Sequence, residues 1–243
     1  MRQALLLVAA CAFAGAAAAE DVRLCGAEAT PASDGRLLNH FPYTLAAPPE
    51  LVRPRRLAGQ CQGLHRALLA DLEALLARAR ADPEVGGRII AMSCFRSRQH
   101  QNRIFCRRGR AIQVQAWQVA PPGFSEHATG LAIDFGDRFG GGCNLETCFA
   151  NTPVGRWLAR NAPDFGFELS FPEGNAQGVA FEPWHWRWVG RGEDGRLARE
   201  IFAAARERFP AAGAATAPPP VREAMPAAAA PAGLPGGTPR VGE

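Results

Sequence analysis

Two short stretches of the sequence carry side chains that could bind a metal ion. His127 and Asp134 lie in the first stretch, and Glu182 and His185 lie in the second. Two imidazoles and one carboxylate can supply the three protein ligands of a catalytic zinc site, which keeps its fourth position open for water. A carboxylate beside the metal that does not bind it can act as the base. We therefore predict one Zn²⁺ ion held by His127, Asp134 and His185, with Glu182 as the catalytic base.

The first stretch has the pattern of a strand that would aim Asp134 at such a site. From Gly130 to Phe135, small residues and Asp134 alternate with large apolar residues. Successive side chains of a strand point to opposite faces, so the apolar set is predicted to enter the core. The small residues leave room beside Asp134, and His127 in the preceding loop can fold over that room. The spacing of Glu182 and His185 can bring both side chains to one side of a turn.

Each of these sequence features can also be explained without a functional site. A histidine followed by an aspartate at this spacing occurs by chance, and a Glu-x-x-His pair often lies on the surface without a function. Trp184 stands between the predicted base and the predicted ligand, where it could wall a substrate pocket and exclude water. Tryptophans at strand spacing are more often part of the core. The small residues beside Asp134 and the tryptophans around His185 together favour a metal site.

The two stretches and a third segment resemble a known family. Ser125–Asp134 has the pattern Ser-x-His-x-x-Gly-x-Ala-x-Asp, and Glu182–His185 reads Glu-Pro-Trp-His. Phe95–Gln101 fits a further signature, an aromatic-Arg-Ser followed by Gln. These motifs resemble the zinc D-alanyl-D-alanine carboxypeptidases of the VanY type, in the group that includes VanX dipeptidases and the hedgehog signalling domain. The resemblance extends over roughly residues 37–189.

The resemblance implies a fold and a substrate. The expected fold is α+β: a single domain with a small, mostly antiparallel sheet, flanking helices and a zinc site. The expected substrate is a peptide that ends in D-alanine, namely the stem peptide of peptidoglycan. An L,D-carboxypeptidase, a dipeptidase or an endopeptidase on the same polymer would carry the same motifs. A zinc-bearing binding module without turnover is a further alternative, although Glu182 argues against it.

The resemblance also assigns roles to three side chains for which the residues alone leave alternatives. A guanidinium can hold a carboxylate or a polarised carbonyl oxygen through two parallel hydrogen bonds, but a surface salt bridge would serve Arg96 equally well. The resemblance favours a catalytic role for Arg96 and a substrate contact for Gln101. It also places Ser125 at the terminal carboxylate of the substrate, with a loop cap that fixes the metal loop as the alternative.

Composition excludes other classes of protein. The sequence contains no lysine, so the Ser-x-x-Lys and Lys-Thr-Gly motifs of serine-type penicillin-binding carboxypeptidases cannot occur. The formal net charge is +4 and falls to +3 without Arg2. This mild charge favours an anionic polymer as partner and lacks the clustered basic stripe of a nucleic-acid-binding protein. We expect a monomer that binds no nucleic acid.

The N-terminus and the cysteines predict that the protein is exported to the periplasm or to the extracellular space. An apolar run from Ala4 to Ala19 ends in small residues, as a signal peptide does, and is too short to span a bilayer. A membrane anchor is the alternative. The cysteines after it form an even set, which favours disulfides in an oxidising compartment. Proximity in the sequence alone predicts the pairs Cys25–Cys61, Cys94–Cys106 and Cys143–Cys148.

The rest of the chain positions these motifs. We predict a signal peptide over residues 1–19, an extended proline-rich arm over 20–60, the zinc carboxypeptidase domain over 61–209 and a disordered Ala/Pro/Gly-rich tail over 210–243. Hydrophobic periodicity and capping residues predict helices over 64–82, 99–119 (which could break at Gly109), 153–162 and 194–209. Alternation predicts strands over 88–95, 165–169 and 185–189.

Overall fold

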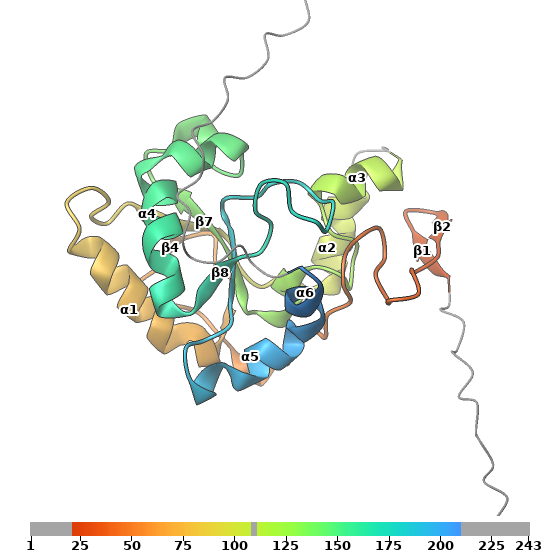
Figure 1. Ribbon diagram of the computed structural model, residues 1–243, viewed down its shortest axis with the longest axis horizontal. Helices are drawn as coiled ribbons and strands as arrows, with labels where there is room; N and C mark the ends of the chain where they lie inside the picture. The colour runs from red at the N-terminus through yellow and green to blue at the C-terminus, as the bar shows by residue number, and fades with distance from the viewer. Residues whose placement is uncertain (1–20, 108–110, 210–243) are drawn as a thin grey trace, which may run out of the picture.

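A five-stranded sheet lies at the centre of the protein. The computed structural model describes residues 21–107 and 111–209 (Figure 1). The strand order is β4-β6-β7-β9-β8. β4 runs parallel to β6, and the other neighbours are antiparallel. The predicted α+β fold with a mostly antiparallel sheet and flanking helices is therefore confirmed, whereas the predicted signal peptide and tail lie outside the described residues.

The elements have the following bounds. The strands are β1 Val22–Leu24, β2 Ala27–Ala29, β3 Leu51–Val52, β4 Ala58–Gly59, β5 Leu64–His65, β6 Ile89–Ser93, β7 Ala132–Asp137, β8 Phe167–Leu169 and β9 His185–Trp188. The α-helices are α1 Leu69–Arg80, α2 Arg98–Phe105, α3 Ile112–Gln118, α4 Pro153–Asn161, α5 Arg196–Ile201 and α6 Ala203–Arg208. The 3-10 helices are η1 Pro48–Glu50, η2 Arg66–Leu68, η3 Glu126–Thr129, η4 Gly141–Cys143, η5 Thr147–Asn151, η6 Ala162–Phe165 and η7 Glu193–Gly195.

One face of the central sheet is apolar. Alternate residues of β7 and the tryptophans of β9 belong to the main core cluster, together with the buried sides of α1 and α4. Both helices lie on the same side of the sheet in Figure 1. Trp188 reaches α1 directly, because its indole N–H donates to Asp71 at 2.9 Å. Burial of this face fixes the register of β7 and β9, and the register decides which side chains point to the other face.

Two corrections concern the ends of helices. The helix predicted to start at Leu64 begins at Leu69, because Leu64 and His65 pair with β3 and the His65 N–H donates to Gly130 O at 2.8 Å. A single helix was predicted over 194–209, but α5 and α6 are separated at Phe202. The Phe202 side chain is fully buried against the ring of Tyr43, which draws the chain into the core at this point.

Other predicted elements agree with the structure. The strand predictions correspond to β6, β8 and β9. Thr152 caps α4 as expected, since its hydroxyl accepts from the Gly155 N–H at 3.0 Å. Residues 99–119 form α2 and α3, and the proposed break at Gly109 falls on residues that the structure does not describe.

The disulfides correct two of the predicted pairs. Cys143–Cys148 is confirmed, but the other bonds are Cys25–Cys106 and Cys61–Cys94. Proximity in the sequence fails because β4 pairs in parallel with β6, so that the segment after β4 meets the end of β6. The Cys25–Cys106 bond joins the β1-β2 hairpin to the end of α2, beside a second, smaller apolar cluster.

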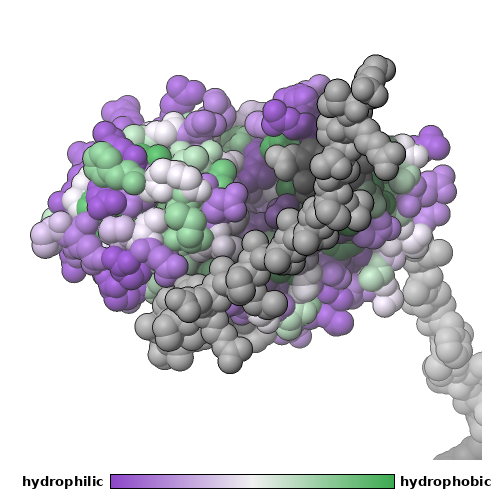
Figure 2. Space-filling view, turned by 90° about the horizontal axis from the view of Figure 1, so that it is seen from above, coloured by the Kyte–Doolittle hydropathy of each residue, from purple (hydrophilic) through white to green (hydrophobic). Residues whose placement is uncertain are grey.

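The surface mixes polar and apolar residues. Figure 2 shows hydrophilic side chains interspersed with small apolar areas over the visible part of one face. Within residues 21–107 and 111–209, every helix is too short or too polar to cross a lipid bilayer.

Candidate metal centre

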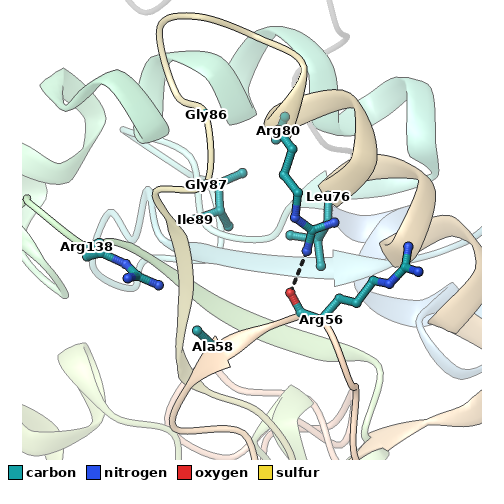
Figure 3. Close-up of a pocket in the computed structure, with 9 residues that line it drawn as sticks. Arg56, Ala58, Leu76, Arg80, Gly86, Gly87, Ile89 and Arg138 are labelled. Atoms are coloured by element: carbon teal, nitrogen blue, oxygen red, sulfur yellow. Dashed lines mark hydrogen bonds between the residues drawn. The ribbon is translucent and has the colours of Figure 1, made fainter.

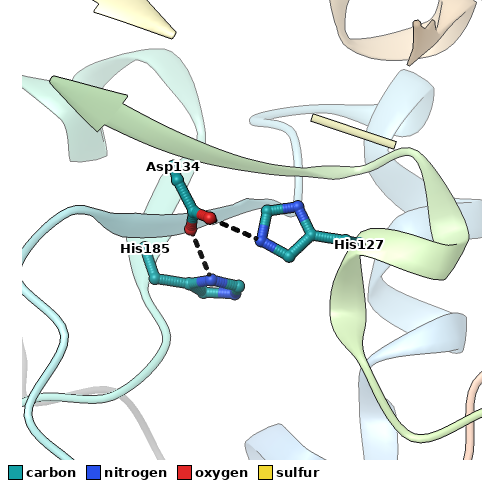
Figure 4. Close-up of side chains that lie close together, drawn as sticks. All are labelled: His127, Asp134 and His185. Carbon is teal, nitrogen blue, oxygen red and sulfur yellow. Dashed lines mark hydrogen bonds and ion pairs between the residues drawn. The ribbon is translucent and has the colours of Figure 1, made fainter. Parts of the chain in front are cut away.

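The register of two neighbouring strands brings the first two predicted ligands together. Asp134 of β7 lies directly opposite His185 of β9 in the antiparallel pair. Opposite residues project to the same face, and here it is the face away from the apolar core. Asp134 Oδ1 lies 2.9 Å from His185 Nδ1 (Figure 4). Both side chains are buried, so the sheet alone places two ligand atoms beside each other.

His127 reaches the same point from the 3-10 helix η3. Its Nε2 lies 3.1 Å from Asp134 Oδ2, and its ring meets that of His185 edge to face at 4.8 Å. Gly130 makes the turn from η3 into β7 with φ +70°, a conformation that residues with a Cβ rarely adopt. A Cβ there would lie 2.8 Å from Leu51 Cδ2. A glycine is therefore needed for His127 to fold back over Asp134.

Hydrogen bonds fix which nitrogen of each ring faces Asp134. His127 Nδ1 lies 2.7 Å from the Cys94 carbonyl oxygen and must donate to it. His185 Nε2 lies 3.0 Å from a carboxylate oxygen of Glu126 and donates to that oxygen. In the neutral rings, His127 Nε2 and His185 Nδ1 then carry lone pairs, and both point at the Asp134 carboxylate. Three electron-pair donors thus converge on one place.

This convergence fits a bound cation. The three ligand atoms lie within 4.8 Å of one another. Among the described residues, His127 Nε2 is the buried side-chain atom without a hydrogen-bond partner. Burial lowers the pKa of His127 to about 4, with a further contribution from Arg96, so the ring is neutral and able to bind a metal. Two imidazoles and one carboxylate match the ligand types of a catalytic zinc site.

The other ligands carry shifted pKa values that have identifiable causes. Burial acts to raise the pKa of Asp134, but the two histidines and Arg96 hold it well below its usual range. Burial acts to lower the pKa of His185, but its hydrogen bonds to Asp134 and Glu126 raise it to about 10. When His185 is charged, its second proton sits on Nδ1 and faces Asp134. A cation that binds Nδ1 must displace this proton.

Glu182 lies beside the ligands without being part of the cluster. Glu182 and His185 are joined by a turn in which the His185 N–H donates to Glu182 O at 3.0 Å, as the spacing predicted. Glu182 Oε2 lies 3.7 Å from His185 Nδ1, and its side chain is 16% exposed. Burial raises its pKa to about 7, and the charge of Asp134 contributes in the same direction. A carboxylate with this pKa can both accept and return a proton near neutral pH.

Arg96 contacts the carboxylate oxygen of Asp134 that does not face His185. It follows β6, and its guanidinium donates to Asp134 Oδ2 at 2.7 Å, to Ser93 Oγ at 2.9 Å and to Gln101 Oε1 at 3.1 Å. The five N–H groups of a guanidinium exceed these three bonds, so donors remain for a substrate. Arg96 is therefore held rigidly next to the metal ligands.

The remaining predicted site residues differ in how they meet this centre. Gln101 is 2% exposed, and both ends of its amide are engaged, because its Nε2 also donates to Ala120 O at 2.7 Å. This favours positioning of Arg96 over a direct substrate contact. Ser125 precedes η3 and makes no side-chain capping hydrogen bond, which weakens the loop-cap alternative. Trp184 is partly buried against the main core.

Sequence reasoning missed Glu126 and Arg187. Glu126 stands inside the first motif, and Arg187 follows His185 by two positions on β9. Burial acts to raise the pKa of Glu126, but Arg187 and His185 outweigh it and lower the pKa to about 2. The signal was available: a residue two positions from His185 shares its face, and an arginine there needs a carboxylate partner.

A separate cavity lies on another part of the molecule. It has a volume of about 230 Å³ and is bordered by Arg56, Arg80 and Arg138, with Leu76 and Ile89 among its apolar lining (Figure 3). Arg80 donates to the backbone oxygen of Arg56 at 2.8 Å. The lining contains no histidine, cysteine or carboxylate, so this cavity has no metal ligands.

Comparison with known protein families assigns most of the described site to one family. The model of the VanY family, D-alanyl-D-alanine carboxypeptidase, matches residues 62–191, which include every predicted ligand described above. The chain belongs to the VanY family. The match therefore confirms the resemblance inferred from the three motifs.

The relatives and a solved structure cover different shares of the chain. The protein YodJ of Bacillus subtilis is 36% identical over 126 residues, which is 49% of this chain and 45% of YodJ. A D-alanyl-D-alanine carboxypeptidase of Enterococcus faecium is 39% identical over 80 residues, 32% of this chain and 24% of that protein. The chain thus spans less than half the length of these two relatives. The structure of the LD-carboxypeptidase LdcB superposes with a TM-score of 0.54 at 27% identity, covering 66% of this chain and 77% of LdcB.

Proposed function

We propose that the protein is a zinc carboxypeptidase that removes the C-terminal D-alanine from the stem peptides of peptidoglycan. The observation that carries this proposal is the convergence of His127, Asp134 and His185, with Glu182 beside them and outside the ligand set. Membership of the VanY family supports the reaction type. A binding module would have no use for a buried carboxylate with a raised pKa at this position.

The metal ligands and Glu182 have separate roles in the proposed reaction. One Zn²⁺ ion held by His127, Asp134 and His185 would act as a Lewis acid and lower the pKa of water to about 7. Glu182 accepts the proton of the attacking water and returns it to the leaving amine. Its proximity to His185 and its pKa of about 7 suit both transfers.

Arg96 and Ser125 are the proposed substrate-binding groups. The remaining N–H donors of Arg96 stabilise the negative charge that develops on the carbonyl oxygen of the scissile bond. Gln101 and Ser93 hold the guanidinium in place for this role. Ser125 would bind the terminal carboxylate of the peptide, and Trp184 would form a wall of the pocket.

A second candidate, an L,D-carboxypeptidase, is favoured by the superposition on LdcB. It would remove D-alanine from a tetrapeptide, where the preceding residue has the L configuration at the bond that is cut. The metal ligands and the base would be the same, so the distinction lies in the substrate pocket. The D-alanyl-D-alanine reaction remains our main proposal because the family model and the Enterococcus faecium relative carry that name.

The proposed location is outside the cytoplasm, where the polymer lies. The Cys25–Cys106, Cys61–Cys94 and Cys143–Cys148 bonds fit an oxidising compartment. We infer a signal peptide over residues 1–19, a catalytic domain over 61–209 and a tail over 210–243. The predicted arm over 20–60 ends in β4, which joins the central sheet of that domain. We also infer that the protein acts as a monomer.

The test is product analysis on defined peptides. The purified protein is incubated with a stem pentapeptide ending in D-Ala-D-Ala and with the corresponding tetrapeptide, and free D-alanine and shortened peptides are measured by mass spectrometry. We expect release from the pentapeptide that a chelator abolishes, added Zn²⁺ restores and penicillin leaves unchanged. Release from the tetrapeptide alone would select the L,D reaction. A zinc-loaded protein that releases nothing from either peptide would overturn both candidates.

A further inference from the structure

A buried row of alternating charges begins at the second histidine ligand. Glu126 is 3% exposed, and each of its oxygens accepts two hydrogen bonds. Oε2 accepts from His185 Nε2 at 3.0 Å and from Ser170 Oγ at 2.6 Å. Oε1 accepts from Arg187 at 3.1 Å and from the Tyr43 hydroxyl at 3.3 Å. Because both carboxylate oxygens of Glu126 already accept two hydrogen bonds each, Glu126 positions its neighbours and does not act as a base.

The row continues outward to the last helix. Arg187 is 2% exposed and donates through Nε to Glu168 Oε2 at 3.3 Å. Glu168 lies opposite Arg187 in the β8-β9 pair, so the sheet register places them on one face. Glu168 also accepts from Arg206 of α6, at 2.8 Å to Oε1 and 3.1 Å to Oε2. Arg206 lies beyond residues 62–191, the part that the VanY family model matches.

We propose that this row, His185–Glu126–Arg187–Glu168–Arg206, positions the second metal ligand and links the metal affinity of the site to helix α6. The proposal rests on the metal site proposed above. Glu126 fixes the His185 ring with a proton on Nε2, so that the lone pair of Nδ1 points at the metal position. Outer partners of this kind orient ligands and raise their basicity.

Arg187, Glu168 and Arg206 matter because the buried carboxylate of Glu126 needs a charged partner that is itself held in place. A buried carboxylate is costly unless it is paired and fully hydrogen-bonded. Arg187 provides the pairing, and it is itself buried, so it needs the second carboxylate, Glu168. Arg206 closes the row at the surface, with 34% of its side chain exposed. Loss of Arg206 leaves Glu168 free to turn away, which loosens Arg187 and then Glu126.

The experiment measures metal affinity, which does not require peptidase activity. Apo-protein is titrated with Zn²⁺ against a chromophoric chelator at 25 °C, where circular dichroism verifies folding. We expect Glu126→Gln to raise the Zn²⁺ Kd by about 10- to 100-fold. Arg206→Gln should raise it by about two- to tenfold, and Arg206→Lys by less than about twofold. The matched control is Arg196→Gln, which removes an exposed Arg–Glu pair with Glu200 on α5 and should leave the Kd unchanged.

The outcomes separate the inference from the proposed function. A wild-type protein that binds no Zn²⁺ would overturn the metal site itself. If the wild-type protein binds Zn²⁺ and either Glu126→Gln or Arg206→Gln binds it equally well, the positioning role is wrong. Lower melting temperatures with an unchanged Kd would show a purely structural row. A raised Kd in a variant that is fully folded at 25 °C supports the proposal.

Discussion

Each histidine of the centre uses one ring nitrogen for support and leaves the other for the proposed metal. His127 is held by a backbone carbonyl, that of Cys94, whereas His185 is held by the carboxylate of Glu126. A carbonyl supplies only a dipole, but a carboxylate supplies a full charge, which makes His185 the more basic ligand. The two imidazoles are therefore not equivalent, although the sequence motifs treat them alike.

The first prediction concerns Glu182. Replacing it with glutamine removes the proton acceptor while the ligand cluster stays intact, so kcat should fall by about 10²- to 10⁴-fold. The Zn²⁺ Kd should change little. Steady-state kinetics on the pentapeptide and a zinc titration measure both. Glu173→Gln, an exposed glutamate in a nearby turn, is the control. A Glu182→Gln protein with more than a tenth of the wild-type kcat would rule out the base assignment.

The second prediction concerns Arg96. Arg96→Gln removes the donors next to Asp134, and kcat should fall by about 10²- to 10³-fold, as for loss of one oxyanion-binding group. A change confined to KM would instead indicate that Arg96 contributes only to ground-state binding. The comparison variant is Arg103→Gln, which replaces an exposed arginine of α2 and should behave like wild type.

Residue types and spacing were sufficient to select the three side chains that the structure brings together, but not the residues that support them. The motifs reveal His127, Asp134 and His185 by residue type and spacing, whereas their meeting depends on the pairing of β7 with β9. Glu126 acts through contacts with Ser170, His185 and Arg187, and contacts between distant segments are not encoded in any interval. The prediction for Gln101 met the same difficulty, since its partner Ala120 lies in another segment.

At the scale of elements, the centre depends on the turn that connects η3 to β7. Asp134 and His185 are aligned by strand register, whereas His127 is aligned by the path of the chain through Gly130 and by its hydrogen bond to the Cys94 carbonyl. The Gly130 carbonyl also accepts from the His65 N–H at 2.8 Å, which fixes the turn against β5. This bond explains why Leu64 and His65 are extended although their periodicity predicted a helix.

The third prediction separates strain from crowding at this turn. Gly130→Ala introduces left-handed strain of roughly 1 to 2 kcal/mol, and a Cβ 3.0 Å from the His65 backbone nitrogen adds about 1 kcal/mol or more. Gly174→Ala is the matched variant, because Gly174 has φ +66° with nothing within 4 Å of an added Cβ. Urea denaturation should show the larger loss of unfolding free energy for Gly130→Ala. Equal losses would mean that crowding at the turn is unimportant.

At the scale of the whole molecule, the disulfides connect parts that pack separately. Cys25–Cys106 spans 81 residues and ties the N-terminal hairpin to the smaller apolar cluster, whereas Cys143–Cys148 spans 5 residues. The pairing could not be derived from the sequence because it follows from the parallel β4-β6 pair and from the packing of α2. The α+β class could be predicted, since alternation and helical periodicity are local properties.

The fourth prediction concerns these bonds. Replacing Cys25 and Cys106 with alanine should lower the free energy of unfolding by about 4.5 kcal/mol, against about 2 kcal/mol for Cys143 and Cys148, because the longer loop gains more chain entropy when it is opened. Denaturation under non-reducing conditions measures both double variants. Peptide mapping of the oxidised protein checks the connectivity independently. A smaller loss for the Cys25/Cys106 variant would show that loop length does not govern the stabilisation.

The central place of β7 has a consequence for how the protein fluctuates. This strand is paired with β6 on one side and β9 on the other, so its amide protons are shielded until the sheet comes apart. We therefore expect slow hydrogen exchange in the segment that carries Asp134, while Glu182 lies in the connection before β9. We expect local opening of that connection to shift Glu182 while Asp134 and His185 stay paired in the sheet.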